Sequence, residues 1–316
     1  MKDIARNLGL SQTTVSHVLR GREAEFRINA STAQRVRTAA RRLGYQPSAL
    51  ARNLKHHRAY TLAIAVGDLS NPFWAGLAVA AQHEAERHGY MLVVNHTGES
   101  LENERQLLEM LRQRRVDGLI LSAAHLKPAD LARLRREKRP LVLVDRTIDG
   151  LDVPSVVTDS VAGIRLAVDH LVAKGHRLIG YLGGPNYIAP FRERLAGFRQ
   201  AMAAQQLRPA LRATAHDAPG PAAHAAARLF RDAPRPTAII AANIWMTIGA
   251  LRAAPDDVEI VGFDDIYLAD LLRRPLTTIA HPVEELGRQA VKLLLAEIAH
   301  PGSSESVVLA PRLIVR

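Results

Sequence analysis

The sequence contains no cysteine, which excludes a disulfide framework and thiolate chemistry and is compatible with a reducing cytoplasm. It also lacks any run approaching the roughly 18 uninterrupted apolar residues of a membrane span. The first residues, MKDIARNLGLSQ, carry charges and no apolar core segment, so we expect no secretory signal. Together these absences predict a cytoplasmic protein without a membrane partner.

The motifs of common enzyme classes are also missing. There is no phosphate-binding P-loop, no GxGxxG after a predicted strand, no GxSxG and no His/Glu metal spacing. The one glycine-rich turn, LGGPN at 182–186, is too weak a signal to indicate a nucleotide site. We therefore predict a protein that is not an enzyme and that uses neither a metal nor a cofactor.

Charge is distributed unevenly along the 316 residues, whose net charge is +11. Residues 1–58 hold twelve Lys and Arg against three Asp and Glu, whereas the other 258 residues hold 30 against 28. A basic segment joined to a nearly neutral body is typical of a protein that binds a polyanion. The alternative is a disordered basic tail, but this segment has regular apolar spacing, which such tails lack.

Residues 1–45 have the pattern of three short helices. Apolar residues recur at helical spacing in 4–8, and Gly9 then allows a turn with positive φ. Ser11 can cap a second helix, which ends at Gly21. Two short helices joined by a glycine-containing turn predict a helix-turn-helix. We expect a third helix to begin with a capping box in STAQ, residues 31–34, and to end at Gly44.

Residues 46–58 read as a linker, and the pattern changes again from residue 59. The linker segment is too short to be stable as an isolated helix, so we expect it to fold only against a partner. Beyond it, short apolar runs alternate with longer amphipathic runs, which predicts parallel strands buried on both faces and helices between them. Strands are expected at 61–66, 91–95, 118–121, 141–145, 178–183, 237–241 and 258–264.

The number of strand–helix units predicts an α/β core of two doubly wound parallel-sheet subdomains, with a ligand cleft at the carboxyl ends of the strands. The expected division is a headpiece at 1–45, a hinge at 46–58 and a core at 59–316. Within the core, the subdomains are expected to comprise 59–158 plus 283–300, and 159–280 plus 305–316.

Six stretches, in order along nearly the whole chain, resemble the LacI/GalR family of bacterial transcriptional regulators. They are KDIARNLGLSQTTVSHVLRG, LGYQPSALARNL, DLSNPFWAGL, RRVDGLIL, RERLAGF and VGFDD…PLTTIAHPVEELGRQAV. The resemblance implies a homodimer whose subunits have a helix-turn-helix headpiece, a hinge helix and a periplasmic-binding-protein-like core. It implies a repressor of transcription that binds a near-palindromic DNA operator, with a sugar-like effector in the core cleft altering that affinity.

In the family pattern the second helix enters the major groove of DNA with its front end. Gln12, Thr13 and His17 stand at base-reading positions, where Gln can pair with adenine and His can donate to guanine. Ser11 and Thr14 lie at the helix start, whose free N–H groups suit a phosphate. The alternatives are solvated polar positions for Gln12 and Thr13, and a contact of His17 with phosphate or a neighbouring side chain.

The resemblance also assigns roles in the hinge. Leu54 stands at the position where paired leucines wedge into the minor groove, and Arg52 and Lys55 are expected against phosphates or the groove floor. The alternative is a plain linker whose leucine packs against the core. The loop from Gly21 to Asn29 is two to three residues longer than the family pattern, which predicts altered contacts with the DNA backbone.

Sugars are bound by carboxylates, amides and arginines that hydrogen-bond hydroxyls in pairs, often beside an aromatic ring. Alternatives remain for two of the expected residues, because a strand-end carboxylate and a helix N-cap occur without any ligand. By family position, the effector-binding set is Arg194, Asn243 and Asp264 in one lobe and Asn71, Phe73 and Asp145 in the other.

The expected cleft departs from the family in three places. Ile244 replaces the usual Asp after Asn243, Ala218 stands where an aromatic residue is common, and the segment between 251 and 258 is short. We hypothesise that Trp245 supplies the missing ring or narrows the pocket. Arg192 is a lower-ranked neighbour of the clamp, which is Arg194, Asn243 and Asp264 together.

A solute-binding protein of the periplasmic type, without regulatory DNA binding, is the alternative function.

Overall fold

The computed structural model of the chain describes all residues except 20, 45–57, 115, 209–210, 216 and 232–233. The chain divides into two compact units, Met1–Ala59 and Tyr60–Arg316. The expected hinge contacts of Arg52, Leu54 and Lys55 lie outside the described residues, so the hinge assignment stays a prediction.

The N-terminal unit contains three helices, α1 (Lys2–Leu8), α2 (Gln12–Leu19) and α3 (Ala30–Arg42). Gly9 ends α1 with φ 65°, a left-handed conformation that glycine adopts without steric cost. Small and branched side chains from all three helices form the core of this unit: Ile4, Ala5, Val15, Val18, Ala33, Val36 and Ala40.

The start of α3 differs from the expectation. Its N-cap is Asn29, whose Oδ1 accepts a hydrogen bond from the backbone N–H of Thr32 at 2.7 Å. The Ser31 hydroxyl lies inside the first turn and donates to the same oxygen at 3.1 Å. The expected capping box at 31–34 is therefore wrong, because the asparagine two residues earlier already satisfies the helix start.

The first sheet of the core has the strand order β11-β5-β4-β3-β1-β2 and is parallel throughout. Its strands arise from largely apolar runs, as the sequence predicts for a parallel sheet, and all are almost wholly buried except the two edge strands, which are partly exposed. They are β1 (Thr61–Val66), β2 (Met91–His96), β3 (Gly118–Leu121), β4 (Leu141–Val144), β5 (Ser155–Thr158) and β11 (Val307–Leu309).

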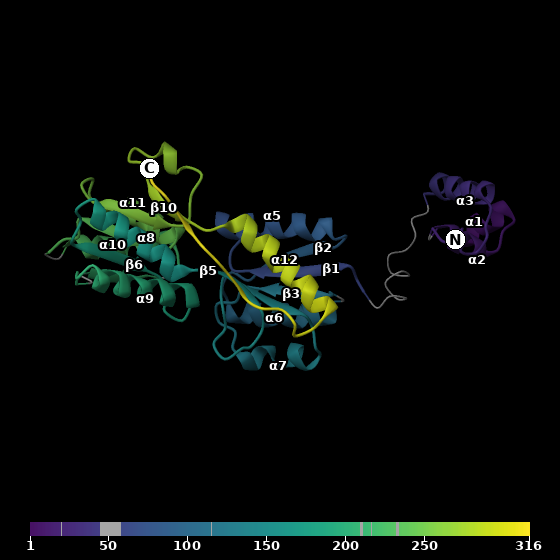
Figure 1. Cartoon of the computed structure of the whole chain (residues 1–316), viewed down its shortest axis with the longest axis horizontal. Helices are drawn as coiled ribbons and strands as arrows, with labels where there is room; N and C mark the ends of the chain where they lie inside the picture. The colour runs from purple at the N-terminus through teal and green to yellow at the C-terminus, as the bar shows by residue number, and fades with distance from the viewer. Residues whose placement is uncertain (20, 45–57, 115, 209–210, 216, 232–233) are drawn as a thin grey trace. The chain divides into compact units, whose positions relative to one another are not determined.

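Helices cover both faces of this sheet (Figure 1). Alternate residues of β1 point in opposite directions, so that Leu62 and Ile64 pack beneath α5 (Pro72–Arg87) and α12 (Val283–Ala299). Ala63 and Ala65 pack on the other side, against α6 (Leu101–Gln113) and α7 (Pro128–Arg136). This period of two along a strand gives the lobe two separate apolar layers.

The second sheet has the order β12-β10-β9-β8-β6-β7, and only β12 runs antiparallel to its neighbour. One continuous apolar cluster joins this sheet to the helices around it. The strands are β6 (Ile179–Gly183), β7 (Leu211–Thr214), β8 (Ala238–Ala241), β9 (Glu259–Phe263), β10 (Thr277–Ala280) and β12 (Arg312–Ile314). The helices are α8 (Ser160–Ala173), α9 (Ala189–Ala204), α10 (Pro219–Arg231), α11 (Ile244–Ala253) and the short 3-10 helix η1 (Ala269–Leu271).

The chain passes between the two sheets three times: after β5, after β10, and between β11 and β12. The expected division gave 305–316 entirely to the second subdomain, which is wrong for 307–309. Those residues form β11 and pair with β5 in the first sheet. The α/β architecture of two doubly wound, mostly parallel sheets with an all-α headpiece is confirmed. In the described part of the chain, every helix is too short or too polar to cross a membrane.

Candidate functional site

The start of α2 has the expected cap and an exposed polar front. The Ser11 Oγ accepts a hydrogen bond from the Thr14 backbone N–H at 2.9 Å and lies 2.8 Å from the Thr14 hydroxyl. Gln12 and Thr13 are exposed, and His17 is half-buried. Because Thr13 and His17 are four residues apart, they share one face of the helix. The three predicted base-reading side chains thus lie outside the unit's core.

In the core, polar residues follow the carboxyl ends of strands in both sheets, where clefts form in doubly wound folds. Six of the seven residues expected to bind an effector line one cavity of about 30 Å³, which holds little more than water. The six are Asn71, Phe73, Asp145, Arg194, Asn243 and Asp264.

The two aspartates that line this cavity have the same unusual backbone conformation. Asp145 follows β4 with φ 62°, and Asp264 follows β9 with φ 77°. A left-handed conformation costs a non-glycine residue roughly 1 kcal/mol and is concentrated at functional sites. Each lobe therefore turns its backbone sharply where a strand ends, and each places a carboxylate at the cavity.

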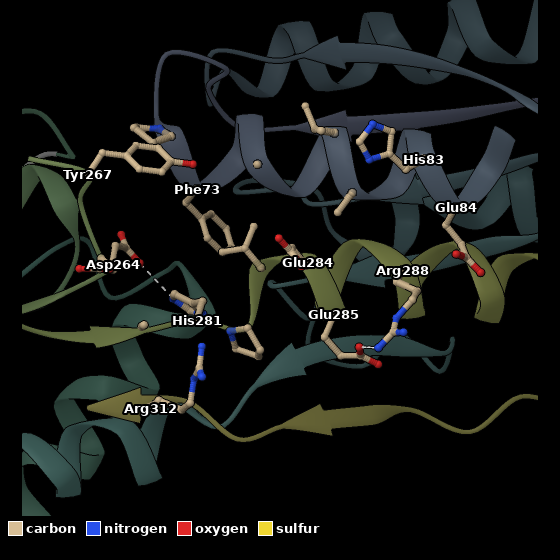
Figure 2. Close-up of a pocket in the computed structure, with 18 of the residues that line it drawn as sticks. Phe73, His83, Glu84, Asp264, Tyr267, His281, Glu284, Glu285, Arg288 and Arg312 are labelled. Atoms are coloured by element: carbon tan, nitrogen blue, oxygen red, sulfur yellow. Dashed lines mark ion pairs between the residues drawn. The ribbon is translucent and has the colours of Figure 1, made fainter. Parts of the chain in front are cut away.

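Asp264 is held by the start of α11 and by His281. Its Oδ2 accepts from the Ile244 backbone N–H at 3.0 Å, and its Oδ1 lies 3.0 Å from His281 Nε2 (Figure 2). Burial alone raises the pKa of Asp264, but the hydrogen bond and charge of His281 and the charge of Arg194 outweigh it, so the pKa lies below its usual value. Asp264 is therefore ionised at neutral pH.

His281 links Asp264 and Arg194 to the point after β5 where the chain crosses from one lobe to the other. Its Nδ1 lies 2.7 Å from the hydroxyl of Thr158, the last residue of β5. Its Nε2 faces both the Asp264 carboxylate and Arg194 Nη2, the latter at 3.1 Å. When Nε2 carries a proton, it donates a hydrogen bond to the Asp264 carboxylate; when Nε2 is unprotonated, it accepts one from the Arg194 guanidinium. Sequence reasoning missed His281, because only the fold brings residue 281 beside residues 158 and 194.

Arg194 projects from α9 and is almost fully buried. Its Nη1 donates to the Ala242 carbonyl at 2.6 Å, and its guanidinium lies 3.8 Å from the centroid of the Phe263 ring. Its Nε has no hydrogen-bond partner among the described residues. A buried guanidinium with an unused donor is costly unless a ligand or water satisfies it.

A second buried arginine, Arg146, also lines the cavity and was missed by the sequence analysis. Its Nη2 donates to Glu99 Oε1 at 2.5 Å, and its guanidinium lies 5.2 Å from the Trp74 ring centroid. In the described structure, Nη1 and Nε lack hydrogen-bond partners, since Asp145 Oδ2 lies 3.8 Å from Nε. The available signal was its position directly after Asp145 at the end of a predicted strand.

The amides of the site also cap helices. Asn243 Oδ1 accepts from the Met246 N–H at 3.0 Å, while its Nδ2 donates to Asp217 Oδ1 at 2.5 Å. Asn71 likewise caps α5 through the Phe73 N–H at 3.0 Å. Both amides are therefore fixed in orientation, which is compatible with the two roles expected for Asn243.

A wider cavity of about 430 Å³ adjoins the small one and shares Asn71, Trp74 and Asp217 with it. Its volume lies within the roughly 300–1,000 Å³ typical of ligand pockets. Trp245, the seventh expected residue, lines this outer cavity together with Tyr187. Aromatic rings therefore line both parts of the cleft, with Phe73, Trp74 and Phe191 at the inner cavity and Trp74, Tyr187 and Trp245 at the outer one.

Arg192 points elsewhere and forms an ion pair with Asp149 at 3.0 Å on the surface. It lines neither cavity, in keeping with its lower rank in the sequence analysis. Within the described residues, no group of His, Asp and Glu has an arrangement suited to holding a metal ion.

The partly buried carboxyl of Asp217 gives the cleft a pH-dependent stability. Burial, only partly offset by Asn243, raises the pKa of Asp217 from 3.8 to about 6. Between these values the unfolded chain ionises while the folded protein keeps the proton, so stability is lost as pH rises through about 6. We expect Asp217→Asn, which cannot ionise, to gain stability relative to the parent as pH rises from 4 to 7, by on the order of 3 kcal/mol at most.

Denaturant unfolding of both proteins at pH 4, 5, 6 and 7 measures this difference. The matched control is Asp149→Asn, at an exposed carboxylate outside both cavities, for which no such rise is expected. A difference between Asp217→Asn and the parent that stays constant over this range would contradict the raised pKa.

A wide groove of about 910 Å³ lies against α5 and α12. Figure 2 shows Asp264 and His281 at one end, beside Tyr267, and charged side chains along the two helices. Arg194, Asn243 and Asp145 are not among its lining residues. The groove therefore lacks most of the clamp and is a poor candidate for the small-molecule site.

Two family descriptions match the chain. Residues 1–48 match the bacterial regulatory proteins of the lacI family, and residues 168–316 match the periplasmic binding protein-like domain. Over 324 residues the chain is 32% identical to a ribose operon repressor of Halalkalibacterium halodurans. The match covers 100% of this chain and 96% of the relative. The ribose operon repressor of Escherichia coli K12 is 34% identical over 328 residues, with 100% and 98% covered.

A solved structure shows the same arrangement of elements. The Lac repressor dimer bound to operator and to the anti-inducer ONPF superposes with a TM-score of 0.88 at 26% identity. The match covers 99% of this chain and 97% of that chain. The similarity thus extends over the headpiece as well as the core.

Proposed function

This chain belongs to the LacI family of bacterial regulatory proteins, and we propose that it is a repressor that binds a near-palindromic operator as a homodimer. It is a DNA-binding transcriptional regulator, as its full-length relatives are repressors. A solute-binding protein is not favoured, because those relatives match the basic N-terminal unit as well as the core. Since its proposed partner is DNA, we place the protein in the cytoplasm.

One observation carries the DNA-binding role: α2 leaves Gln12 and Thr13 exposed at its capped N-terminus while Val15 and Val18 fill the core. Side chains at the front of such a helix reach base edges, and the free N–H groups beside Ser11 suit a phosphate. The basic side chains of this unit add an attraction to the DNA phosphates, which is the same for every base sequence. The hinge roles of Arg52, Leu54 and Lys55 remain part of the proposal.

A dimer places two such helices on the two halves of one site. The surface that suits a second copy is the wide groove of Figure 2, with exposed Val79 on α5 and Tyr267 on the other lobe. Leu268 and Leu271 are also exposed, beside or within η1. Val79 and Tyr267 line the same groove, and exposed apolar side chains along one groove favour a protein partner; the similar Lac repressor is a dimer on its operator.

The cleft supports an uncharged sugar as effector, with ribose the first candidate because two relatives are ribose operon repressors. Arg146 and Arg194 have three buried nitrogen atoms without hydrogen-bond partners among the described residues, and their N–H groups suit hydroxyl oxygens. Asp264 and Asn243 provide the complementary acceptors. The nearby carboxylates Asp264 and Glu99 offset the two guanidinium charges, so a phosphorylated sugar is disfavoured.

Trp245 takes part in this proposal as the ring that stacks on the sugar. It lines the outer cavity, whereas Ala218 offers no ring at the usual position. Because the inner cavity is too small for a sugar ring, binding requires the lobes to move apart there and close again. His281 contacts both Thr158 and Asp264. A movement of the lobes that shifts Thr158 would therefore also shift the position of His281 against Asp264.

Thermal unfolding with a panel of sugars tests the effector. At about 100 times its Kd, a ligand stabilises the protein by about 2.7 kcal/mol, which raises the Tm by roughly 5–10 °C. We expect ribose at millimolar concentration to give such a rise, ribose 5-phosphate to give none, and Arg146→Gln to abolish the rise. Arg192→Gln, at an arginine outside both cavities, is the matched control and should behave as the parent. A rise that persists undiminished in Arg146→Gln would remove that arginine from the site.

A further inference from the structure

The loop that follows α2 places an aromatic ring on the proposed reading helix. The ring of Phe26 stacks on the imidazole of His17, with centroids 3.5 Å apart and planes inclined by 22°. The guanidinium carbon of Arg22 lies 5.0 Å from the centroid of the same phenyl ring. The loop thus supplies a phenyl ring, with an arginine beside it, to the one half-buried member of the predicted reading set.

This contact is not part of the headpiece core. Phe26 is 44% exposed, whereas Ile28 of the same loop packs against the core of the headpiece. The core cluster consists of side chains from α1, α2 and α3, and Phe26 is not one of them. The phenyl ring therefore packs on the reading helix and not between the three helices.

A backbone hydrogen bond to α2 and an ion pair to α3 hold the loop in place. The Arg22 N–H donates to the His17 carbonyl at 3.0 Å, so the loop begins directly beneath that residue. The Glu23 carboxylate pairs with Arg37 of α3. Arg27, next to Phe26, has φ 51°, a conformation that non-glycine residues rarely adopt outside constrained sites. The end of the loop is tied to its start, because the Ile28 N–H donates to the Glu23 carbonyl at 2.8 Å, and these contacts keep the phenyl ring over the imidazole.

The stack also decides which ring nitrogen of His17 can meet DNA. Nδ1 is buried and has no hydrogen-bond partner among the described residues. A buried N–H without an acceptor is costly, so the favoured neutral ring has its proton on Nε2. The available atom is then a donor, and the major-groove acceptors of purines are guanine O6 and N7 and adenine N7.

We propose that Phe26 is a specificity-determining positioning residue, which fixes the His17 ring so that its Nε2–H reads a purine acceptor, guanine first, in each half-site. The inference rests on the proposed function, in which α2 enters the major groove. The longer loop between Gly21 and Asn29 then contributes to base choice from outside the reading helix. Its Phe26 ring stacks on His17, which contacts the base, and does not contact a base itself.

Selection of bound sequences from a random duplex pool tests this with the full chain. Comparing the parent with His17→Ala identifies the base pair that His17 specifies. We expect Phe26→Leu to lower the purine preference at that pair by roughly two- to tenfold, the value of an aromatic pair, and to leave every other position unchanged. Phe26→Tyr, which retains the ring, should restore the preference. Leu43→Ala, at another exposed apolar residue of this unit, is the matched control.

The outcomes separate the two levels of the account. A parent protein that selects no motif overturns the proposed function and this inference with it. A parent that selects a symmetric motif, with Phe26→Leu giving the same preference at the His17 pair, overturns the inference alone. Loss of preference at all positions in Phe26→Leu, together with a lower helical content by circular dichroism, shows a merely structural role and also overturns it.

Discussion

Replacing Gln12 and Thr13 together with alanine lowers the affinity for the selected operator by roughly a thousandfold or more, to the level of a scrambled duplex. Both side chains are exposed on α2, so their removal leaves the core of the headpiece unchanged. Each base contact contributes about 1–3 kcal/mol, and a dimer makes each contact twice. Since 1.4 kcal/mol is a tenfold change, the sum exceeds three powers of ten. Fluorescence anisotropy with a labelled operator measures the loss.

The control for this variant uses the same residue types on another helix. Gln34 and Thr38 are exposed on α3, and Gln34→Ala with Thr38→Ala should change operator affinity by less than about tenfold. The response of the Gln12/Thr13 variant to sugar in thermal unfolding should equal that of the parent. If the double variant on α2 still preferred its operator over the scrambled duplex, α2 would not be the reading helix.

The second large effect concerns Asp264. Asp264→Asn removes a buried charge that pairs with His281 and lies near Arg194. A hydrogen bond from a sugar hydroxyl to an ionised carboxylate contributes about 1.5–3 kcal/mol, so sugar affinity should fall by roughly 10- to 150-fold. Asn keeps an oxygen for the Ile244 N–H, and we expect operator affinity without sugar to be retained. Isothermal titration with ribose and anisotropy with the operator measure the two quantities.

The adjacent Asp265 provides the matched control for this variant. Its carboxylate pairs with Arg316 and accepts from the Thr278 hydroxyl, and it does not line the inner cavity. Asp265→Asn should therefore bind sugar as the parent does. Equal loss of sugar affinity in both variants would point to general destabilisation and would contradict the role assigned to Asp264.

The fold was predictable where strands are almost wholly apolar. The seven expected runs, such as 61–66 and 118–121, became strands with ends within one or two residues, because burial on both faces leaves a clear signal. The expectation missed β5 (SVVT), β7 (LRAT), β10 (TTIA) and the C-terminal β11 and β12. These strands are short or rich in threonine and arginine. Their partners, which decide that they are strands, lie far away in the sequence.

The site was predictable to a more limited extent. Family positions and strand ends identified six residues that the fold brings to one cavity. Arg146, Asp217 and His281 were missed, because their convergence depends on loops and on the passages between the lobes. In the headpiece, the long loop was noticed, but the stack of Phe26 on His17 depends on backbone turns that sequence patterns do not specify.

The central claim is that the basic N-terminal unit recognises a symmetric DNA site as half of a dimer. Sedimentation velocity of the full chain, with its selected duplex and with a scrambled one at physiological ionic strength, tests this most directly. We predict two chains on each selected duplex, at concentrations roughly a thousandfold below those needed to load the scrambled duplex. A single chain on each duplex, with equal loading of the two sequences, would contradict the account.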